Sequence, residues 1–208
     1  VRILVTFSEA VKDSPDPQLT WSVTSGITGG GGTGYMSKNS STEFRYDWTV
    51  PAGDGTVTMS LGVAQDLAGN VVVATPTSNA SFIVDNTVPT YSAGEVTSSD
   101  TQNATLTFIE NLAVTSLSAT DFDIEYSNDS GTTYNYLHQG SVNTGADIAL
   151  NGSIIDISLN TAVTSELWAL YATYTKSGTT NQNIKDLADN ELASFTRSSM
   201  NNNTGTGE

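Results

Sequence analysis

The sequence predicts an all-β fold of two tandem β-sandwich domains, and three observations lead to this prediction. Thr, Ser, Asn and Gly are abundant in the 208-residue chain, and 37% of its residues are hydrophobic, which is enough for a core. Apolar and polar residues alternate at residues 56–61 and 104–108, as in strands with one buried face. A short acidic motif also occurs twice, which indicates a repeated unit.

The repeated motif is an Asp-rich turn, preceded in each copy by an apolar strand that ends in glutamate. The turns read Asp66-Leu67-Ala68-Gly69-Asn70 and Asp186-Leu187-Ala188-Asp189-Asn190. The strands read Val5-Thr6-Phe7-Ser8-Glu9 and Leu106-Thr107-Phe108-Ile109-Glu110. These landmarks keep their order but not their spacing, so the chain is a tandem repeat of two related units.

The two units are predicted to span residues 1–88 and 89–198, followed by a flexible tail at residues 199–208. A unit of about 100 residues is the usual size of a β-sandwich. Pro89 suits the joint, because proline cannot donate to a sheet ladder and it restricts the direction of the chain. The tail is rich in Asn, Gly and Thr, which is typical of loose polar segments.

In the first unit, alternation and turn signals predict six strands, at residues 2–8, 19–24, 43–49, 56–63, 71–74 and 80–85. The glycine-rich residues 29–34 lack a following Lys-Ser or Lys-Thr pair and a helix pattern. We therefore interpret them as a flexible loop between strands and not as a phosphate-binding loop.

In the second unit, strands are predicted near residues 91–97, 103–109, 122–127, 133–139, 147–150, 153–159, 166–175 and 191–196. Helix signals are weak, with a short turn expected within residues 113–120. The alternation of Asp121-Phe122-Asp123 places Phe122 in the core and the two carboxylates, extended by Glu125, on a solvated face.

The second unit begins with a strand that has no counterpart in the first. The first unit opens inside the strand Val1-Arg2-Ile3-Leu4-Val5, so we expect its first strand to be missing. Either an upstream segment of a longer chain supplies that strand, or a neighbouring subunit adds it to the open sheet edge. Both alternatives predict an unpaired edge or groove beside residues 1–7.

Lys and Arg are scarce, so the net charge is −15 although only 14% of the residues are charged. A chain without a basic patch is a poor ligand for nucleic acid, and anionic membranes repel it. No apolar run is long enough to span a bilayer. The absence of cysteine removes disulfides and thiolate metal sites. We expect cations as partners, and neither nucleic acid nor membrane insertion.

Calcium is the expected cation, because it takes six to eight oxygen ligands from carboxylates, carbonyls and amide side chains. In the first unit, Glu9, Asp66 and Asp85 are predicted to meet at one pole of the sandwich and to bind it. The competing interpretation is that Asp66 and Asn70 only build an Asx turn, with Gly69 at a positive φ. The two interpretations are compatible.

The second unit offers a related calcium site at Glu110 and Asp186. Asp189 stands at the position of Gly69, which adds a third carboxylate but makes a positive φ less favourable. Carboxylates that cluster without a counter-ion repel one another, and few basic residues are available to neutralise them.

Catalytic residues are not evident in the sequence. His138 is the only histidine, and no Ser-His-Asp arrangement surrounds it, so we expect no enzymatic activity. Trp21, Trp48 and Trp168 lie in strand-like segments, where aromatic side chains usually pack in the core. An exposed row of Trp or Tyr on a sheet face would instead favour carbohydrate binding.

The motifs of both units resemble known repeat families. Val5-Thr6-Phe7-Ser8-Glu9-Ala10-Val11, the first Asp-rich turn and Phe82-Ile83-Val84-Asp85-Asn86-Thr87-Val88-Pro89 resemble the bacterial and archaeal immunoglobulin-like (Ig-like) repeats of large adhesins and surface-layer proteins. Asp121-Phe122, residues 171–175 and residues 184–190 make the second unit similar to a related repeat family, named for a cyanobacterial swimming-motility surface protein.

This resemblance implies two tandem Ig-like sandwiches, an extracellular or cell-surface location and calcium at the joints, with Glu9, Asp66 and Asp85 as ligands. The sequence departs from the pattern at Asp189, where the family usually has Gly, and no Asp-x-Thr-x-Pro segment follows Phe195. We expect a structural module of an adhesin stalk, S-layer or fibre, in contact with neighbouring domains, identical subunits or surface glycans. A carbohydrate- or surface-binding module of a secreted protein is the alternative.

Overall fold

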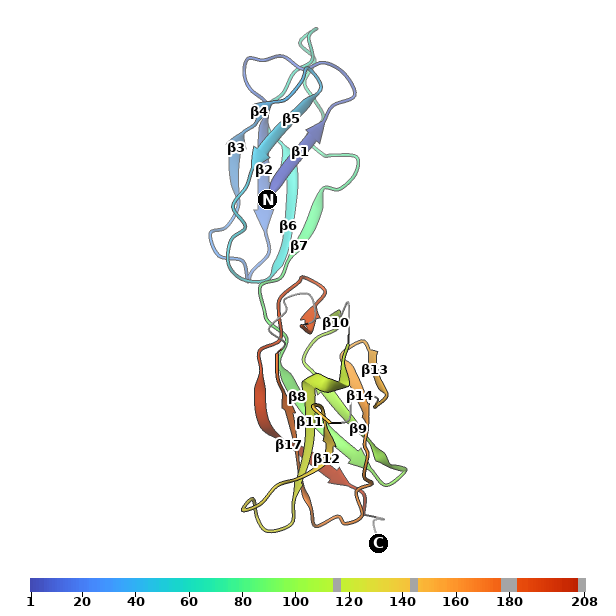
Figure 1. The fold of residues 1–208 in the computed structure, drawn as a ribbon. Helices are drawn as coiled ribbons and strands as arrows, with labels where there is room; N and C mark the ends of the chain where they lie inside the picture. The colour runs from blue at the N-terminus through green and yellow to red at the C-terminus, as the bar shows by residue number, and fades with distance from the viewer. Residues whose placement is uncertain (114–116, 143–145, 177–182, 206–208) are drawn as a thin grey trace. The chain divides into compact units, whose positions relative to one another are not determined.

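A computed structural model describes the protein at residues 1–113, 117–142, 146–176 and 183–205. Within these ranges the regular elements are strands, apart from one three-residue 3-10 turn (Figure 1). The predicted all-β class is therefore confirmed. The chain divides into two compact units, Val1–Thr87 and Val88–Glu208, called unit 1 and unit 2 below.

Unit 1 arranges its strands in two antiparallel sheets. The strands are β1 (Arg2–Thr6), β2 (Gln18–Val23), β3 (Gly32–Tyr35), β4 (Ser37–Lys38), β5 (Glu43–Asp47), β6 (Gly55–Leu61) and β7 (Ser81–Val84). One sheet has the order β1-β5-β4 and the other the order β3-β2-β6-β7. Both sheets contribute to one apolar core, which contains Phe44 of the first sheet and Leu19 and Val57 of the second.

The glycine-rich segment of unit 1 forms part of a strand, contrary to the sequence prediction of a loop. Its last residues belong to β3, which pairs with β2. A Cβ atom on Gly32 would lie 2.6 Å from the ring of Trp21, and one on Gly34 would collide with the ring of Tyr46. The glycines are needed because aromatic rings cover this strand. The strand predicted at residues 71–74 is reduced to a bridge between Gln65 and Val71.

Unit 2 is built on one eight-stranded mixed sheet, which curls around its core. Its elements are β8 (Tyr91–Thr97), β9 (Asp100–Phe108), β10 (Leu112–Ala113), η1 (Ala119–Asp121), β11 (Phe122–Ser127), β12 (Asn135–Gln139), β13 (Ile148–Asn151), β14 (Ile154–Ser158), β15 (Ala169–Tyr174), β16 (Lys185–Asp186) and β17 (Phe195–Asn203). The large sheet has the order β12-β11-β15-β17-β8-β9-β14-β13, and β10 pairs with β16. Only β17 and β8 pair in parallel among the described strands.

The end of β17 corrects the predicted flexible tail. Residues 199–203 were expected to be loose, but they belong to this strand, and the side chain of Met200 lies in the core. Asn201, Asn202 and Asn203 pair in parallel with Glu95, Val96 and Thr97. The prediction was wrong because it relied on the polar composition of this segment. Backbone pairing and one buried side chain are enough to hold a polar segment in a sheet. Residues 206–208 lie outside the described residues.

The strand β11 is buried on both faces, which the sequence did not predict. Phe122 lies in the core as expected, with 1% of its surface exposed. Glu125 was expected on a solvated face, yet only 3% of it is exposed. Arg197 donates to both of its carboxylate oxygens, each at 3.1 Å, and lies 4.0 Å over the ring of Tyr134. The predicted turn before β11 is η1, and residues 114–116 lie outside the described part.

Candidate metal centre

The two Asp-rich turns have the same hydrogen-bonded shape. In the first, Oδ1 of Asp66 accepts from the backbone N–H of Asn70 at 2.8 Å, and Oδ2 accepts from its side-chain amide at 2.6 Å. In the second, Oδ1 of Asp186 accepts from the backbone N–H of Asn190 at 2.9 Å, and Oδ2 accepts from its side-chain amide at 2.8 Å. The first is therefore an Asx turn, as the competing interpretation proposed for Asp66 and Asn70, and the second has the same form.

The hydrogen bonds of the first turn stabilise the ionised form of its aspartate. Donation from the side-chain amide and then the backbone N–H of Asn70 holds the pKa of the Asp66 carboxyl below its ordinary value. The charge is thus retained in a residue that is only 8% exposed. A carboxylate with this environment is available as a cation ligand through its remaining lone pairs.

Asp85 does not meet Glu9 and Asp66, contrary to the sequence prediction. Strands β6 and β7 are antiparallel, with Gly55 opposite Val84, and the Asp66 turn lies in the connection between them. Asp85 follows the far end of β7, so roughly 20 Å of strand separates it from the end of β6 that leads to Asp66. Glu9 and Asp66 do line one pocket of unit 1.

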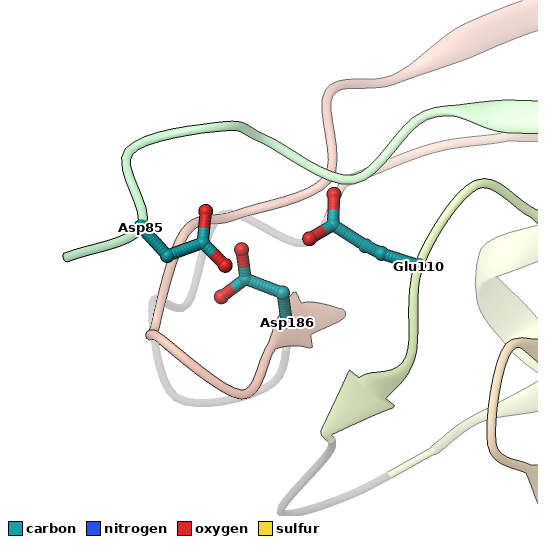
Figure 2. A group of neighbouring side chains, drawn as sticks. All are labelled: Asp85, Glu110 and Asp186. Atoms are coloured by element: carbon teal, nitrogen blue, oxygen red, sulfur yellow. The ribbon is translucent and has the colours of Figure 1, made fainter. Parts of the chain in front are cut away.

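Asp85 instead lies in a group of three carboxylates with Glu110 and Asp186 (Figure 2). One oxygen from each residue lies within 4.8 Å of the others. Asp186 is 2% exposed, and the other two are half-buried. Asp85 belongs to the connecting segment after β7, Glu110 follows β9, and Asp186 ends β16. The structure thus brings together Glu110 and Asp186 as predicted, with a third residue from the connecting segment.

Strand pairing on both sides of Glu110 explains why the group forms. Just before it, the backbone N–H of Ile109 donates to the carbonyl of Thr90 at 3.1 Å, which anchors the start of unit 2. Just after it, Leu112 pairs with Asp186. The end of β9 is therefore held between the connecting segment and the Asp-rich turn, and each contributes a carboxylate. Thr87 donates its N–H to Asp85 at 3.1 Å, which shapes the segment locally.

Asp189 is not part of this group, although the sequence proposed it as a ligand. Its carboxylate accepts a hydrogen bond from the ammonium of Lys185 at 2.7 Å, and its side chain is 81% exposed. Its φ of 76° is positive, like the φ of 96° at Gly69 in the first turn, a region that glycine adopts without strain. The residue therefore points to solvent while the turn keeps the same backbone course.

The acidic group favours a hard divalent cation. Three carboxylates at this spacing repel one another, and a cation among them offsets that repulsion. Oxygen ligands in a partly exposed loop region are typical of calcium, which tolerates irregular geometry and completes its coordination with carbonyls and water. Magnesium demands a more regular octahedron. The residues present therefore form a possible acidic site for a metal ion.

The other residues singled out in the sequence have structural surroundings. His138 is fully buried, with Nε2 3.0 Å from the carbonyl of Ala119 and Nδ1 3.3 Å from Oδ1 of Asn160. Trp48 is in the core of unit 1. Trp21 and Trp168 are partly buried and pack against the cores of their units. The tryptophans therefore follow the core-packing prediction.

Comparison with models of protein families found none that matches the chain, and comparison with curated proteins also found no match. Within the described ranges, no helix is long and apolar enough to cross a membrane. The carboxylate group and the repeated architecture are therefore the features on which a function is argued.

Proposed function

We propose that this protein is a structural, non-enzymatic module of a microbial surface protein, such as an adhesin stalk, an S-layer subunit or a fibre subunit. Its two units are Ig-like β-sandwiches, and calcium stiffens them. The repeated Asp-rich turns, the separate core of each unit and the carboxylate group support this proposal.

The Ig-like architecture is argued from the strand pattern. In unit 1, two antiparallel sheets share one core, and inward and outward side chains alternate along β6. In unit 2, the large sheet encloses one core between strands from its two halves, such as Ile124 of β11 and Ile155 of β14. Both arrangements enclose a core between strands that lie on opposite sides of it, as a sandwich does.

The observation that carries the calcium proposal is the meeting of Asp85, Glu110 and Asp186. Calcium bound there fixes the connecting segment to the end of β9 and to the second Asp-rich turn. The expected affinity is that of extracellular modules, with a dissociation constant on the order of 0.1–1 mM. Such a site fills outside cells, where calcium is abundant, which is consistent with the proposed location.

The charge of the chain fits the same role. With a net charge of −15, it is repelled by nucleic acid and by anionic membrane surfaces. The partners that we propose are neighbouring domains or identical subunits, with surface glycans as a further class.

Calcium-dependent stability tests the proposal. Calcium at ten times its dissociation constant should stabilise unit 2 by about 1.4 kcal/mol, since a ligand bound only by the folded state shifts unfolding. Thermal unfolding with calcium and with chelator measures this effect. Asp186→Asn and Glu110→Gln should abolish it.

Asp66→Asn is the matched control, because it alters an Asx turn with the same hydrogen bonds but outside the carboxylate group. It should lower the stability of unit 1 and leave the calcium response of unit 2 intact. A wild-type chain that calcium does not stabilise would contradict the proposal, as would an equal response in Asp186→Asn.

A carbohydrate- or surface-binding module is the second candidate, and one group of tyrosines favours it. Tyr136 and Tyr171 lie opposite Glu125 on the two neighbouring strands, and Tyr134 packs edge-on against Tyr171 with centroids 5.5 Å apart. Tyr136 is 45% exposed. Aromatic rings on a sheet face can stack on sugars. Loss of glycan retention on a panel of immobilised polysaccharides in Tyr136→Ala, with retention by wild type, would support this candidate.

A further inference from the structure

A lysine, a glutamate and an asparagine lie together in unit 2, and none of them belongs to the carboxylate group. The ammonium of Lys176 forms an ion pair with Oε2 of Glu191. The side-chain amide of Asn183 donates a hydrogen bond to the carboxylate of Glu191. An amine and a carboxamide therefore share one carboxylate, which can move protons between them. These are the groups needed to replace one amide by another.

Hydrogen bonds of the backbone hold the three side chains near one another. Lys176 follows β15, and its N–H donates to Oγ of Ser194 at 2.9 Å. The N–H of Leu192 donates to the carbonyl of Ile184 at 2.8 Å. Ile184 and Leu192 directly follow the asparagine and the glutamate in the sequence. The segment that carries the glutamate is therefore bonded to both of the others.

Asn183 is buried with one of its polar atoms unpaired. It is 3% exposed, and its Oδ1 has no hydrogen-bond partner among the described residues. Such an atom costs free energy in a folded protein, so native structures contain few of them. The next residue, Ile184, is 1% exposed and donates its N–H to the hydroxyl of the buried Tyr174 at 3.2 Å. The amide carbon of Asn183 is thus shielded from water, so an amine that reaches it does not compete with hydrolysis.

Glu191 is placed to carry protons between the amine and the amide. Hydrogen bonding to Lys176, and more weakly to Asn183, holds the pKa of its carboxyl below the ordinary value, so its resting form is the carboxylate. Its side chain is 23% exposed, and that of Lys176 is 38% exposed. A partly buried carboxylate in contact with both groups can take a proton from the ammonium and later give one to the leaving nitrogen.

We infer that Lys176 and Asn183 join through an isopeptide bond, an amide between two side chains, with Glu191 as the acid–base group. Glu191 takes a proton from the ammonium, and Nζ of Lys176 attacks Cγ of Asn183. The new C–N bond forms as the electron pair of the carbonyl moves to Oδ1. When that pair returns, the bond from Cγ to Nδ2 breaks, and Glu191 relays the protons from Nζ to Nδ2. One ammonium ion leaves, the carboxylate is restored, and no group is oxidised or reduced.

This bond closes the connection between β15 and β16. β16 is two residues long, and among the described strands it pairs only with β10. The isopeptide bond keeps this short strand next to the end of β15 even when that pairing opens. Because β16 ends at Asp186, the second Asp-rich turn is held as well. The linkage forms without calcium, so its failure would leave the proposed calcium-stiffened module untouched.

Intact mass spectrometry of the full chain tests the linkage. Folded wild-type protein, incubated with calcium or with chelator, should weigh less than its sequence by one ammonia molecule. Trypsin should then fail to cut after Lys176, because its amine is acylated. Fragmentation of the linked peptide should assign the loss to Lys176 and Asn183 together. A loss of ammonia by cyclisation of an asparagine alone would leave Lys176 open to trypsin.

Three variants separate the roles of the groups, and a fourth is the matched control. Lys176→Arg keeps the positive charge opposite Glu191 and removes the nucleophile, so this chain should keep its full mass. Asn183→Ala should do the same. Glu191→Gln should slow the linkage by at least about a hundredfold, as expected when a general acid–base group is lost. In the control, Lys185→Arg, the altered lysine pairs with Asp189 instead, so the chain should link as fully as wild type.

Tryptophan fluorescence during urea unfolding shows whether each variant is folded. If a variant does not fold, the mass and the tryptic map of the wild-type chain decide. Two results would overturn the inference. One is folded wild-type protein that still has the full mass of its sequence after prolonged incubation, and the other is an equal loss of ammonia in Lys176→Arg.

Discussion

The Asp-rich turns of the two units have the same internal hydrogen bonds but different neighbours. In unit 1, Asp66 faces a pocket that it shares with Glu9. In unit 2, Asp186 meets Glu110 and the carboxylate of Asp85. The five-residue motif determines the shape of the turn locally. The residues around each turn determine which carboxylates lie beside it. The same motif can therefore belong to two different sites.

Each unit has its own core, and truncating a core side chain should give the largest effect on stability. Phe44 of unit 1 and Phe122 of unit 2 are at most 1% exposed. Either Phe→Ala change should destabilise its own unit by about 3–5 kcal/mol, through lost burial and the cavity left behind. Chemical denaturation followed by Trp fluorescence in a Trp168→Phe background, where Trp21 and Trp48 remain, reports unit 1. A Phe122→Ala change that unfolds unit 1 as well would contradict separate cores.

Exchanging Gly69 and Asp189, the fourth residues of the two turns, should change stability by a smaller amount. The change should destabilise unit 1 and stabilise unit 2. Gly69 and Asp189 have φ values of 96° and 76°. A side chain in this region costs roughly 1 kcal/mol. Gly69→Asp should therefore destabilise unit 1, and Asp189→Gly should stabilise unit 2 by a similar amount, less the exposed ion pair with Lys185.

Urea unfolding midpoints of the single and double exchange variants measure these two effects. The space around Gly69 is open apart from the ammonium of Lys12, 3.3 Å from an added Cβ, so backbone conformation dominates. If Gly69→Asp and Asp189→Gly shift stability in the same direction, the two turns do not have equivalent backbones.

Acid sensitivity gives the smallest effect. Hydrogen bonds from the side chain and backbone of Thr133 hold the pKa of Asp129 in unit 2 to about 2. The pKa of Asp66 in unit 1 is also lowered. A depressed pKa stabilises the fold above the ordinary pKa of about 3.8, and this stability is lost as the pH falls toward 2.

Asp129→Asn should therefore make the stability of unit 2 less dependent on pH between about 4 and 2. The slope of stability against pH should fall by at most the amount that corresponds to binding about one proton on unfolding. Asp66→Asn should do the same for unit 1. Urea titrations at several pH values measure both slopes. An unchanged slope in Asp129→Asn would show that its hydrogen bonds are lost before protonation.

Much of the fold could be predicted because alternation marks strands directly. The predicted and observed limits of β8 and β11 coincide, and Phe122 is in the core as its position in the alternation implied. The prediction failed where tertiary contacts override composition. Gly32 and Gly34 form a strand because rings of distant residues cover it, and Glu125 is buried because Arg197, far along the chain, reaches it.

Two of the three carboxylates in the candidate site were expected to lie together, and the reason is topological. Glu110 and Asp186 were paired correctly, since each lies beside a strand end that the repeat makes recognisable. Asp85 was assigned to the wrong partners. The direction of β7 relative to β6 would have corrected this, because a residue after the second strand of a hairpin lies opposite its connecting turn. Sequence motifs alone do not give strand direction.

The parallel pairing of β17 with β8 has a consequence for how unit 2 forms during synthesis. The hydroxyl of Tyr91 donates to the carbonyl of Ser199, 108 positions along the chain. Such distant pairing carries a loop-closure cost and slows folding. Until the residues of β17 leave the ribosome, β8 has one unpaired edge next to an apolar interior. Nascent unit 2 therefore stays open to wrong strand partners until almost its whole length has been made.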